Sequence, residues 1–335
     1  MNLKSKLRKE VSISSSGKLL NAKAISVLKD SHYFVEPYDL DGDAPKEFIR
    51  AYFYEKDSGV RKANPKSWFP YIAKSAEKWY PHESVIEFMI NRIGETLDIN
   101  MNQVRLLVIN GQIRFLSQYF LNRNETLNHG AEICGEYLDD HDMAVEIAEN
   151  KNTARELFTF EFIEEALKAV FPSCYEDLVK DLIRMTAFDA LAGNNDRHFY
   201  NWAVIDTKKK TRKKPKFAPI YDSARGLLWN FSDENVVNMY KDYKQGGKRL
   251  EKYINKASPR ISIERNNSAN HFELIQFIKN YSEEYKKVVD ELSTPEYELK
   301  VQEMISEEFF PYFIDERKYL ISKMIEIRFN KVREI

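Results

Sequence analysis

The sequence predicts an α+β fold of two lobes, a small β-rich lobe over residues 1–120 and a larger, mainly helical lobe over residues 121–335. Three observations support this. Before residue 121, short apolar runs of strand length surround a single helical pattern. After residue 121, apolar residues recur at helical spacing over long stretches. No Gly/Ser-rich linker separates the two parts, so we expect a hinge between the lobes rather than a flexible tether.

The composition indicates a globular protein without selecting a function. Apolar residues make up 43% of the chain, which is enough for a substantial core. The 51 basic and 52 acidic residues nearly cancel, so the overall charge favours neither a nucleic-acid nor a membrane partner. Cys134 and Cys174 lack C-x-x-C spacing and are expected to be buried thiols in a reducing compartment. Neither a secretory signal nor a run of 18 apolar residues occurs, so we expect no membrane span.

The first lobe is predicted to contain strands, one helix and a hairpin. Alternation over residues 11–14 and a run over 48–54 predict its first strands. Residues 68–74 predict a strand that ends on Lys74, and residues 83–98 have the apolar spacing of a helix. Strands over 104–109 and 112–120 are separated by Asn110-Gly111, a strong signal for a two-residue hairpin turn.

The second lobe is predicted to be helical around one loop and one further hairpin. Helices are expected over 154–170 and 175–191, and several more from about residue 235 to the end. Between them, a loop over 192–198 precedes a hairpin of residues 202–205 with 217–221. Seven of the nine residues 208–216 in its connection are basic. We interpret this run as a solvated hairpin tip rather than a nucleic-acid patch, so no nucleic-acid partner is expected.

Asp196, Asn201 and Asp222 are the candidate residues for phosphoryl transfer in the second lobe. That reaction needs a carboxylate to orient the attacking hydroxyl and oxygen ligands for Mg²⁺. Asp196 and Asn201 have the Asp-x4-Asn spacing of a kinase catalytic loop, although Asn/Asp clusters are more often ordinary turns. Asp222 ends the return strand of the hairpin, so it should fold back beside Asn201 as a second metal ligand. A strand-end cap is the alternative interpretation of Asp222.

The first lobe adds candidates for binding ATP. Lys74 at a strand end and Glu87 on the next helix match a phosphate-binding lysine held by a carboxylate, with Glu83 as a competing partner. The strand that ends at Gln118, Tyr119 and Phe120 leads into the second lobe, where a kinase hinge offers backbone groups to adenine. The order of these parts favours ATP and Mg²⁺ as cofactors.

Two motifs carry a resemblance to a known family, the HipA-like kinases. The segments Gly193-Asn194-Asn195-Asp196-Arg197-His198-Phe199-Tyr200-Asn201 and Ala218-Pro219-Ile220-Tyr221-Asp222 resemble the family's G-N-x-D-x-H-x-x-N and A-P-x-Y-D motifs. The resemblance spans roughly residues 68–225 and implies a bilobal protein-kinase-like fold, akin to the phosphatidylinositol kinases, with serine/threonine protein kinase activity. It implies these roles: Asp196 as the catalytic base, Asn201 and Asp222 as Mg²⁺ ligands, Lys74 as the phosphate-binding lysine, and His198 beside the nucleotide.

The chain also differs from full-length HipA toxins and resembles compact bacterial members of the family. It has a shorter region ahead of the lysine strand, where Ser58-Gly59 is either a reduced phosphate loop or a turn. The resemblance implies a protein substrate with a Ser/Thr hydroxyl, possible autophosphorylation and a toxin- or effector-like role. An antitoxin-like partner is not assumed. The expected location is the bacterial cytoplasm, with delivery into a host cell as an alternative.

Three other functions remain as alternatives. A nucleotide-binding pseudokinase would use the same fold as an interaction switch, and a kinase acting on a lipid or small molecule would use the same chemistry. A metal-dependent nuclease built on Asn195, Asp196 and His198 is disfavoured, because no further His/Asp cluster lies near the motif in the sequence.

Overall fold

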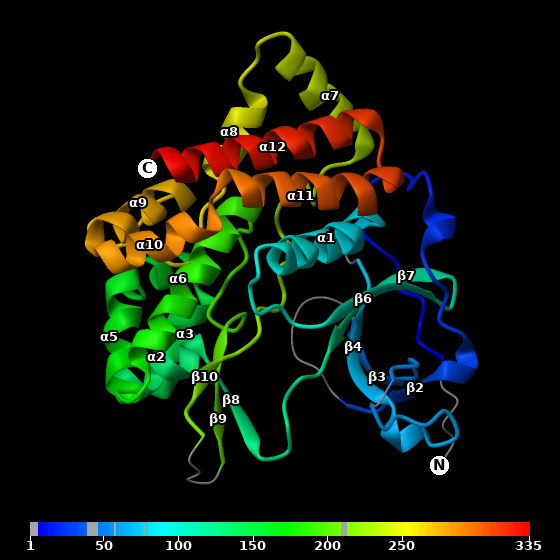
Figure 1. Cartoon of the computed structure of the whole chain (residues 1–335), viewed down its shortest axis with the longest axis horizontal. Coiled ribbons are helices and arrows are strands. Elements are labelled where there is room, and N and C mark those ends of the chain that lie inside the picture. Colours follow the sequence, from blue (N-terminus) through cyan, green and yellow to red (C-terminus); the bar gives the residue numbers. More distant parts are fainter. Residues whose placement is uncertain (1–5, 39–45, 57, 77, 209–212) are drawn as a thin grey trace.

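The chain folds into two lobes that lie side by side, as a computed structural model shows (Figure 1). The structure describes all residues except 1–5, 39–45, 57, 77 and 209–212. A sheet lobe, in blue and cyan, lies beside a helical lobe, in green. Helices α11 (Pro295–Glu308) and α12 (Asp315–Glu334) run across the top of both. The predicted bilobal α+β fold is confirmed.

The first lobe is built on a five-stranded antiparallel sheet in the order β2-β3-β4-β7-β6. The strands are β2 (Tyr33–Glu36), β3 (Lys46–Ala51), β4 (Phe69–Lys74), β6 (Val104–Ile109) and β7 (Gln112–Gln118). Asn110 and Gly111 both have positive φ, at 50° and 72°, which is the geometry that a two-residue hairpin turn needs. The predicted strands over 68–74, 104–109 and 112–120 are confirmed within two residues.

The strand predicted over residues 11–14 is largely wrong. Only β1 (Ser14–Ser15) forms, and it pairs in parallel with β5 (Trp79–Tyr80) outside the main sheet. Val11 and Ile13 are 93% and 74% exposed, so their alternation with serine does not mark a buried face. Among the described residues, short 3-10 helices occupy connections between other elements, at Ala22–Ala24, Asp30–His32, Pro65–Ser67 and Phe310–Tyr312.

Helix α1 (His82–Thr96) joins the two lobes. Its buried apolar side chains belong to the same hydrophobic cluster as the core of the helical lobe. The rings of Phe88 and Phe309 lie 5.7 Å apart, and Arg92 forms an ion pair of 2.8 Å with Glu308 at the end of α11. In Figure 1, α1 accordingly lies between the sheet and α11. Packing on both sides therefore fixes the position of α1.

The helical lobe is built from helices that follow residue 129 along the chain. The remaining helices are α2 (Gly130–Leu138), α3 (His141–Glu149), α4 (Lys151–Leu157), α5 (Phe160–Val170), α6 (Tyr175–Ala192), α7 (Asp233–Lys244), α8 (Arg249–Lys256), α9 (His271–Tyr281) and α10 (Glu283–Leu292). The helix predicted over 175–191 is confirmed as α6. Cys134 and Cys174 are free and buried, as predicted. None of the helices in the described ranges is long and apolar enough to cross a membrane.

The prediction of a single helix over 154–170 is wrong, because the helix is interrupted between Leu157, the end of α4, and Phe160, the start of α5. Thr159 caps α5 by accepting a hydrogen bond from the Phe162 N–H at 3.2 Å. The Phe160 N–H instead bonds the Ser262 carbonyl at 2.9 Å. Apolar spacing continues across this break because Phe158 and Phe160 are both fully buried, so the pattern alone does not reveal it.

A three-stranded sheet lies where the two lobes meet. It consists of β8 (Glu125–His129), β9 (Ala203–Thr207) and β10 (Lys216–Phe217) in the order β10-β9-β8. The predicted hairpin is confirmed, but its return strand ends at Phe217 rather than Tyr221. Ile220 exchanges backbone hydrogen bonds of 2.8 and 2.9 Å with Asn100 and Asn102 instead. The segment before Asp222 therefore pairs with residues 100–102 of the first lobe instead of continuing the hairpin. Of the basic run, residues 209–212 lie outside the described residues.

His82 makes folding stability depend on pH. The side chain is fully buried, with Nδ1 2.8 Å from Ser16 Oγ, and burial followed by the nearby Arg317 charge lowers its pKa to about 3. The unfolded chain binds a proton near pH 6.5, so stability is full above that pH and falls as the pH drops toward 3. Between pH 7 and pH 5, we expect the unfolding free energy of the wild type to fall by about 2 kcal/mol more than that of His82→Gln.

Urea unfolding at the two pH values measures this effect. His141→Gln is the matched control, because that side chain is 62% exposed. Equal losses of stability in the His82 variant and the wild type would contradict the assignment.

Candidate active site

Lys74, Glu87 and Asp222 form one charged cluster between the lobes. Lys74 is the last residue of β4, and its Nζ lies 3.2 Å from Glu87 Oε1 on α1 and 2.7 Å from Asp222 Oδ1. Glu83 is not the partner, because its Oε2 accepts hydrogen bonds from the Lys78 and Trp79 N–H groups. The structure therefore pairs Lys74 with Glu87 and brings Asp222 to the same point.

The pKa shifts of the cluster follow from its burial. Burial by itself lowers the pKa of Lys74, but the carboxylates of Asp222 and Glu87 outweigh it and raise the pKa above 10.5. Burial by itself raises the pKa of Asp222, but Lys74 outweighs it and lowers that pKa. For Glu87, burial outweighs the attraction of Lys74 and raises the pKa to about 7. The ammonium and the Asp222 carboxylate are thus both charged at neutral pH.

Arg197 brings Asn201 and Asp222 together. Its Nη1 donates to the Asn201 carbonyl at 2.9 Å and to the Tyr221 carbonyl at 2.6 Å. Asp222 has a φ of +54°, a left-handed conformation that Asp tolerates better than most residues. A buried arginine, rather than the strand pairing that the sequence predicts, therefore links the backbone of Asn201 to that of Tyr221, the residue before Asp222.

A buried ion pair anchors Arg197 itself. Its Nε and Nη2 donate to the two carboxylate oxygens of Asp189 on α6, at 2.9 and 3.0 Å, and Nη2 also donates to Ser223 Oγ at 2.6 Å. Arg197 and Asp189 are each 2% exposed. Sequence reasoning did not assign either residue. The available signal was an acidic residue within the apolar stretch 187–192 at the end of the helix, eight positions before an arginine.

The predicted catalytic loop, residues 193–201, is also held by the first turn of α2. The N–H groups of Gly130 and Ala131 donate to the carbonyls of Trp202 and Phe199, both at 3.1 Å. Gly130 is required at this contact, because a Cβ would lie 2.3 Å from the Trp202 ring. Tyr221 Oη donates to the Tyr200 carbonyl at 3.0 Å and lies 3.1 Å from Nδ1 of His129, which caps α2. These contacts hold the loop against the start of α2.

Asp196 is paired with two arginines that sequence reasoning missed. Arg225 forms a two-bond contact with the carboxylate, with Nε–Oδ2 at 3.0 Å and Nη1–Oδ1 at 3.1 Å. Arg260 Nη2 lies 3.4 Å from Oδ1. The Asp196 carboxylate is 13% exposed, so it remains within reach of a substrate. Ionised carboxylate oxygens have further lone pairs, so Asp196 can still accept a hydrogen bond from a hydroxyl group.

His198 and Asn201 both follow Asp196 in the loop. Asn201 Nδ2 donates to the Asp196 carbonyl at 2.9 Å, which leaves the amide oxygen as the group available for a ligand. His198 Nδ1 accepts from the Tyr200 N–H at 3.2 Å. Burial lowers the pKa of His198 more than the charges of Asp196 and Asp222 raise it. His198 is therefore neutral at pH 7.

The predicted hinge has fewer free backbone donors than expected. The N–H groups of Gln118 and Tyr119 already bond the carbonyls of Gln103 and Pro70, at 2.9 and 3.0 Å. Within the described ranges, the Phe120 N–H has no such partner. The Phe120 ring lies 5.9 Å from the Tyr221 ring and packs on a small apolar cluster of Ala203, Ile205 and Ala218. That these residues bind adenine stays a prediction. Of the three backbone N–H groups, the one of Phe120 is the candidate donor to adenine.

Ser58-Gly59 is a turn at the wrong end of the sheet for a phosphate loop. It lies in the connection from β3 to β4, and Ser58 Oγ donates to the Glu55 carbonyl at 2.8 Å. In the sheet, Lys74 pairs with Lys46, whereas Phe69 at the start of β4 pairs with Ala51. At about 3.4 Å per residue, the 58–59 connection begins about 17 Å from Lys74. The connection that meets Lys74 is 37–45, of which 39–45 lies outside the described residues.

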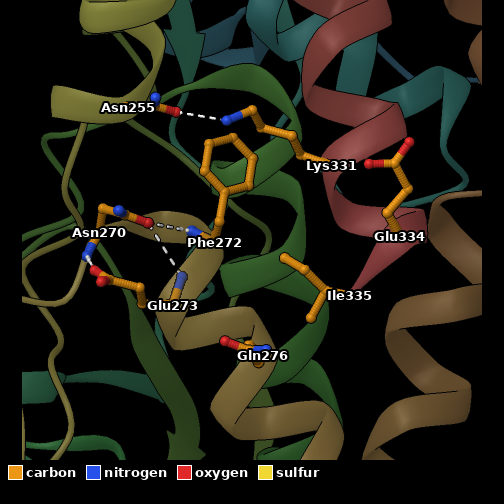
Figure 2. A pocket seen from close by; sticks show the side chains of 8 residues that line it. All are labelled: Asn255, Asn270, Phe272, Glu273, Gln276, Lys331, Glu334 and Ile335. Atoms are coloured by element: carbon orange, nitrogen blue, oxygen red, sulfur yellow. Dashed lines mark hydrogen bonds between the residues drawn. The ribbon is translucent and has the colours of Figure 1, made fainter.

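A separate cavity of 420 Å³ lies against α9 and the end of α12 and contains none of the predicted site residues. Figure 2 shows Lys331 extending to Asn255, with Phe272 beneath it. Its lining residues are Asn255, Asn270, Phe272, Glu273, Gln276, Lys331, Glu334 and Ile335. Across the described part of the chain, no group of three or more His, Cys, Asp or Glu side chains could hold a metal ion.

The two lobes, with a lysine–carboxylate pair in one and an Asp-Asn-Asp set in the other, define a bilobal kinase-like protein. The family model described as the HipA-like C-terminal domain matches residues 40–293, which is more than half of the chain. The protein therefore belongs to the HipA-like family, as the motifs predicted, and family and fold together support a kinase.

Two solved structures are similar to this chain, and the first of them supports the fold. The Helicobacter pylori proinflammatory kinase CtkA matches with a TM-score of 0.58 and 13% identity, over 79% of this chain and 90% of CtkA. HipA of Shewanella oneidensis MR-1, solved with HipB and its operator DNA, matches with a TM-score of 0.48 and 14% identity, over 90% of this chain and 68% of HipA. A search of curated proteins gave no match. At these identities the structural likeness concerns the fold alone.

Proposed function

We propose that the protein is an ATP- and Mg²⁺-dependent serine/threonine protein kinase. The observation that carries this proposal is the cluster in which Lys74 contacts both Glu87 and Asp222, across the boundary between the lobes. Phosphoryl transfer needs positioned cations around the phosphates and a carboxylate beside the attacking hydroxyl, and little covalent chemistry from the protein. Lys74, Asn201, Asp222 and Asp196 supply these groups in one region.

The oxygen donors fit Mg²⁺ bound together with ATP. Mg²⁺ usually takes one or two protein ligands and completes its shell with water and substrate phosphates. The Asn201 amide oxygen and the Asp222 carboxylate are such ligands, and the absence of a larger ligand cluster among the described residues agrees with a metal that arrives with the nucleotide. When bound, Mg²⁺ would neutralise charge on the phosphates. Lys74 would bind the phosphates, and Glu87 would keep its ammonium in place.

Asp196 would act as the catalytic base. Its role would be to accept a hydrogen bond, and then the proton, from the acceptor hydroxyl as the hydroxyl oxygen bonds to the γ-phosphorus of ATP and ADP leaves with the bridging oxygen. Arg225 holds both carboxylate oxygens, so it orients the group. In this assignment His198 is a neutral neighbour of the nucleotide, and Phe120 presents its N–H and its ring to adenine.

A labelled-phosphate assay with three acceptors tests the substrate class. Wild-type protein with Mg²⁺ and γ-labelled ATP would be incubated with a mixture of Ser/Thr peptides, with phosphatidylinositol vesicles, and with a panel of small alcohols. The proposal predicts label on peptide serine or threonine. Label only on lipid or a small molecule would favour that alternative, and ATP binding without any transfer would favour the pseudokinase switch.

The biological setting is proposed from the family. We infer a bacterial cytoplasmic protein with a toxin- or effector-like role that includes autophosphorylation, with delivery into a host cell as the alternative. An antitoxin-like partner is not assumed, and co-purification from cells that express the chain would show whether one binds.

Glu87→Gln should weaken the use of ATP. Above pH 7, where the Glu87 carboxyl with its raised pKa of about 7 is mostly ionised, a neutral amide no longer fixes the Lys74 ammonium. The lost charge-assisted hydrogen bond corresponds to a fall of about 10- to 100-fold in kcat/KM for ATP. Steady-state kinetics with varied ATP would measure it. Glu95→Gln on the same helix is the control, since Glu95 pairs with Arg92 at the surface. Equal effects of the two variants would contradict the role of Glu87.

A further inference from the structure

Two arginines contact the single carboxylate of Asp196, and the charge of a lysine acts on the same region. Arg225 already makes two hydrogen bonds to it, which is enough to balance one negative charge. Arg260 adds one long contact of 3.4 Å, and its Nε is buried without a hydrogen-bond partner among the described residues. The lysine is Lys151, the first residue of α4. Burial, followed by the positive charges of Arg260 and Arg155, lowers the pKa of Lys151, and Asp196 opposes this.

The loop that carries Arg260 is held in place by a buried arginine. Arg155 on α4 donates from Nε to the Asn267 carbonyl at 2.9 Å and from Nη2 to the Ala269 carbonyl at 2.7 Å, and it also bonds the Pro259 carbonyl next to Arg260. Arg155 is 6% exposed. Since α4 also carries Lys151, both extra cations are fixed relative to each other.

These cations are separate from the proposed ATP cluster. The ion pairs of Asp222 go to Lys74, whereas those of Asp196 go to Arg225 and Arg260. The surplus positive charge therefore lies at Asp196, beside which the acceptor hydroxyl would bind in the proposed mechanism, and not at Asp222. Arginine has five N–H donors that match the geometry of a carboxylate or phosphate, and Arg260 uses one of them within the described structure.

We propose that the acceptor site takes a serine or threonine flanked by anionic groups, carboxylate or phosphate, which Arg260 and Lys151 bind. This inference rests on the proposed protein kinase function and specifies its substrate class. Arg225 remains the residue that orients Asp196. An acidic flanking group would satisfy the free donors of Arg260 while its neighbouring hydroxyl lies at the Asp196 carboxylate.

Peptide binding tests this proposal without requiring phosphoryl transfer. Four fluorescent peptides would share one serine and differ in flanking residues, which are glutamate, phosphoserine, glutamine or lysine. Anisotropy with Mg²⁺ and ADP present gives each Kd. We expect the glutamate and phosphoserine peptides to bind at least about tenfold more tightly than the lysine peptide. Their relative affinity shows which anion the site prefers.

Variants locate the preference. Arg260→Gln and Lys151→Gln should each reduce the preference for acidic over basic peptides several-fold, and Arg260→Lys should retain part of it. Lys180→Gln makes the same change in net charge at a surface pair with Glu284 and should leave the preference unchanged. Thermal melting would confirm that each variant is folded.

The outcomes separate this inference from the kinase assignment. No binding of any peptide, a preference for lysine flanks, or an unchanged preference in both Arg260→Gln and Lys151→Gln would overturn the inference. Label transfer from ATP would be measured with the same peptides. An acidic preference without transfer would support the anionic site and contradict the kinase function.

Discussion

Asp196→Asn is expected to reduce phosphoryl transfer by about 100- to 10,000-fold, the usual contribution of a general base. An amide is almost the same size as the carboxylate, but it cannot accept the hydroxyl proton. The Lys74, Glu87 and Asp222 cluster does not depend on Asp196, so the affinity for ATP should change by less than about threefold. The variant thus separates nucleotide binding from catalysis.

The comparison needs ATP affinity from calorimetry and transfer rates from labelled ATP. Asp181→Asn is the matched control, because Asp181 forms an exposed ion pair with Arg184 on α6. Transfer by Asp196→Asn at more than a tenth of the wild-type rate would show that another group accepts the proton.

Arg197→Met is expected to lower the free energy of unfolding by about 3–5 kcal/mol. The substitution leaves the Asp189 carboxylate buried with Asn194 as its remaining side-chain partner among the described residues. It also removes the bonds that join the carbonyls of Asn201 and Tyr221. Both effects act on the catalytic loop, so residual folded protein should also have reduced Mg²⁺-dependent ATP binding.

Chemical unfolding measures this loss, with Arg184→Met as the control. Arg184 is 41% exposed in its pair with Asp181, and loss of such a surface pair costs about 0–1 kcal/mol. If Arg197→Met cost less than about 1 kcal/mol, the Asp189 pair would not be the anchor of the loop.

Local sequence signals predicted the elements that define the fold. The apolar run before Lys74, the helical spacing after residue 83 and the Asn110-Gly111 turn each depend on neighbouring residues, and the structure has all three. The break at Thr159 was missed because its cause is partly distant: the backbone there bonds Ser262, about a hundred residues away. Exposure of Val11 and Ile13 is likewise a property of the tertiary fold.

The site was predicted in part. The residues that were not predicted lie far along the chain from the motif residues that they contact. Lys74, Glu87 and Asp222 could be named because a lysine at a strand end, a carboxylate on the next helix and a motif aspartate each have a local signal. Arg225 and Arg260 lie 29 and 64 positions from Asp196, and no motif reasoning assigned them. Ser58-Gly59 was considered as a phosphate loop because it contains a glycine near the lysine strand. Only strand pairing shows which connection meets Lys74.

The most direct test of the kinase proposal is phosphate label on protein serine or threonine, measured for wild type with Mg²⁺, for wild type with EDTA, and for Asp222→Asn. The account predicts that the wild type labels protein only when Mg²⁺ is present. The rate of labelling should fall at least about 100-fold in Asp222→Asn and should equal that of the wild type in the control Asp181→Asn. Undiminished transfer without Mg²⁺, or in Asp222→Asn, would contradict the assignment of Asp222 as the metal ligand of an ATP-dependent kinase.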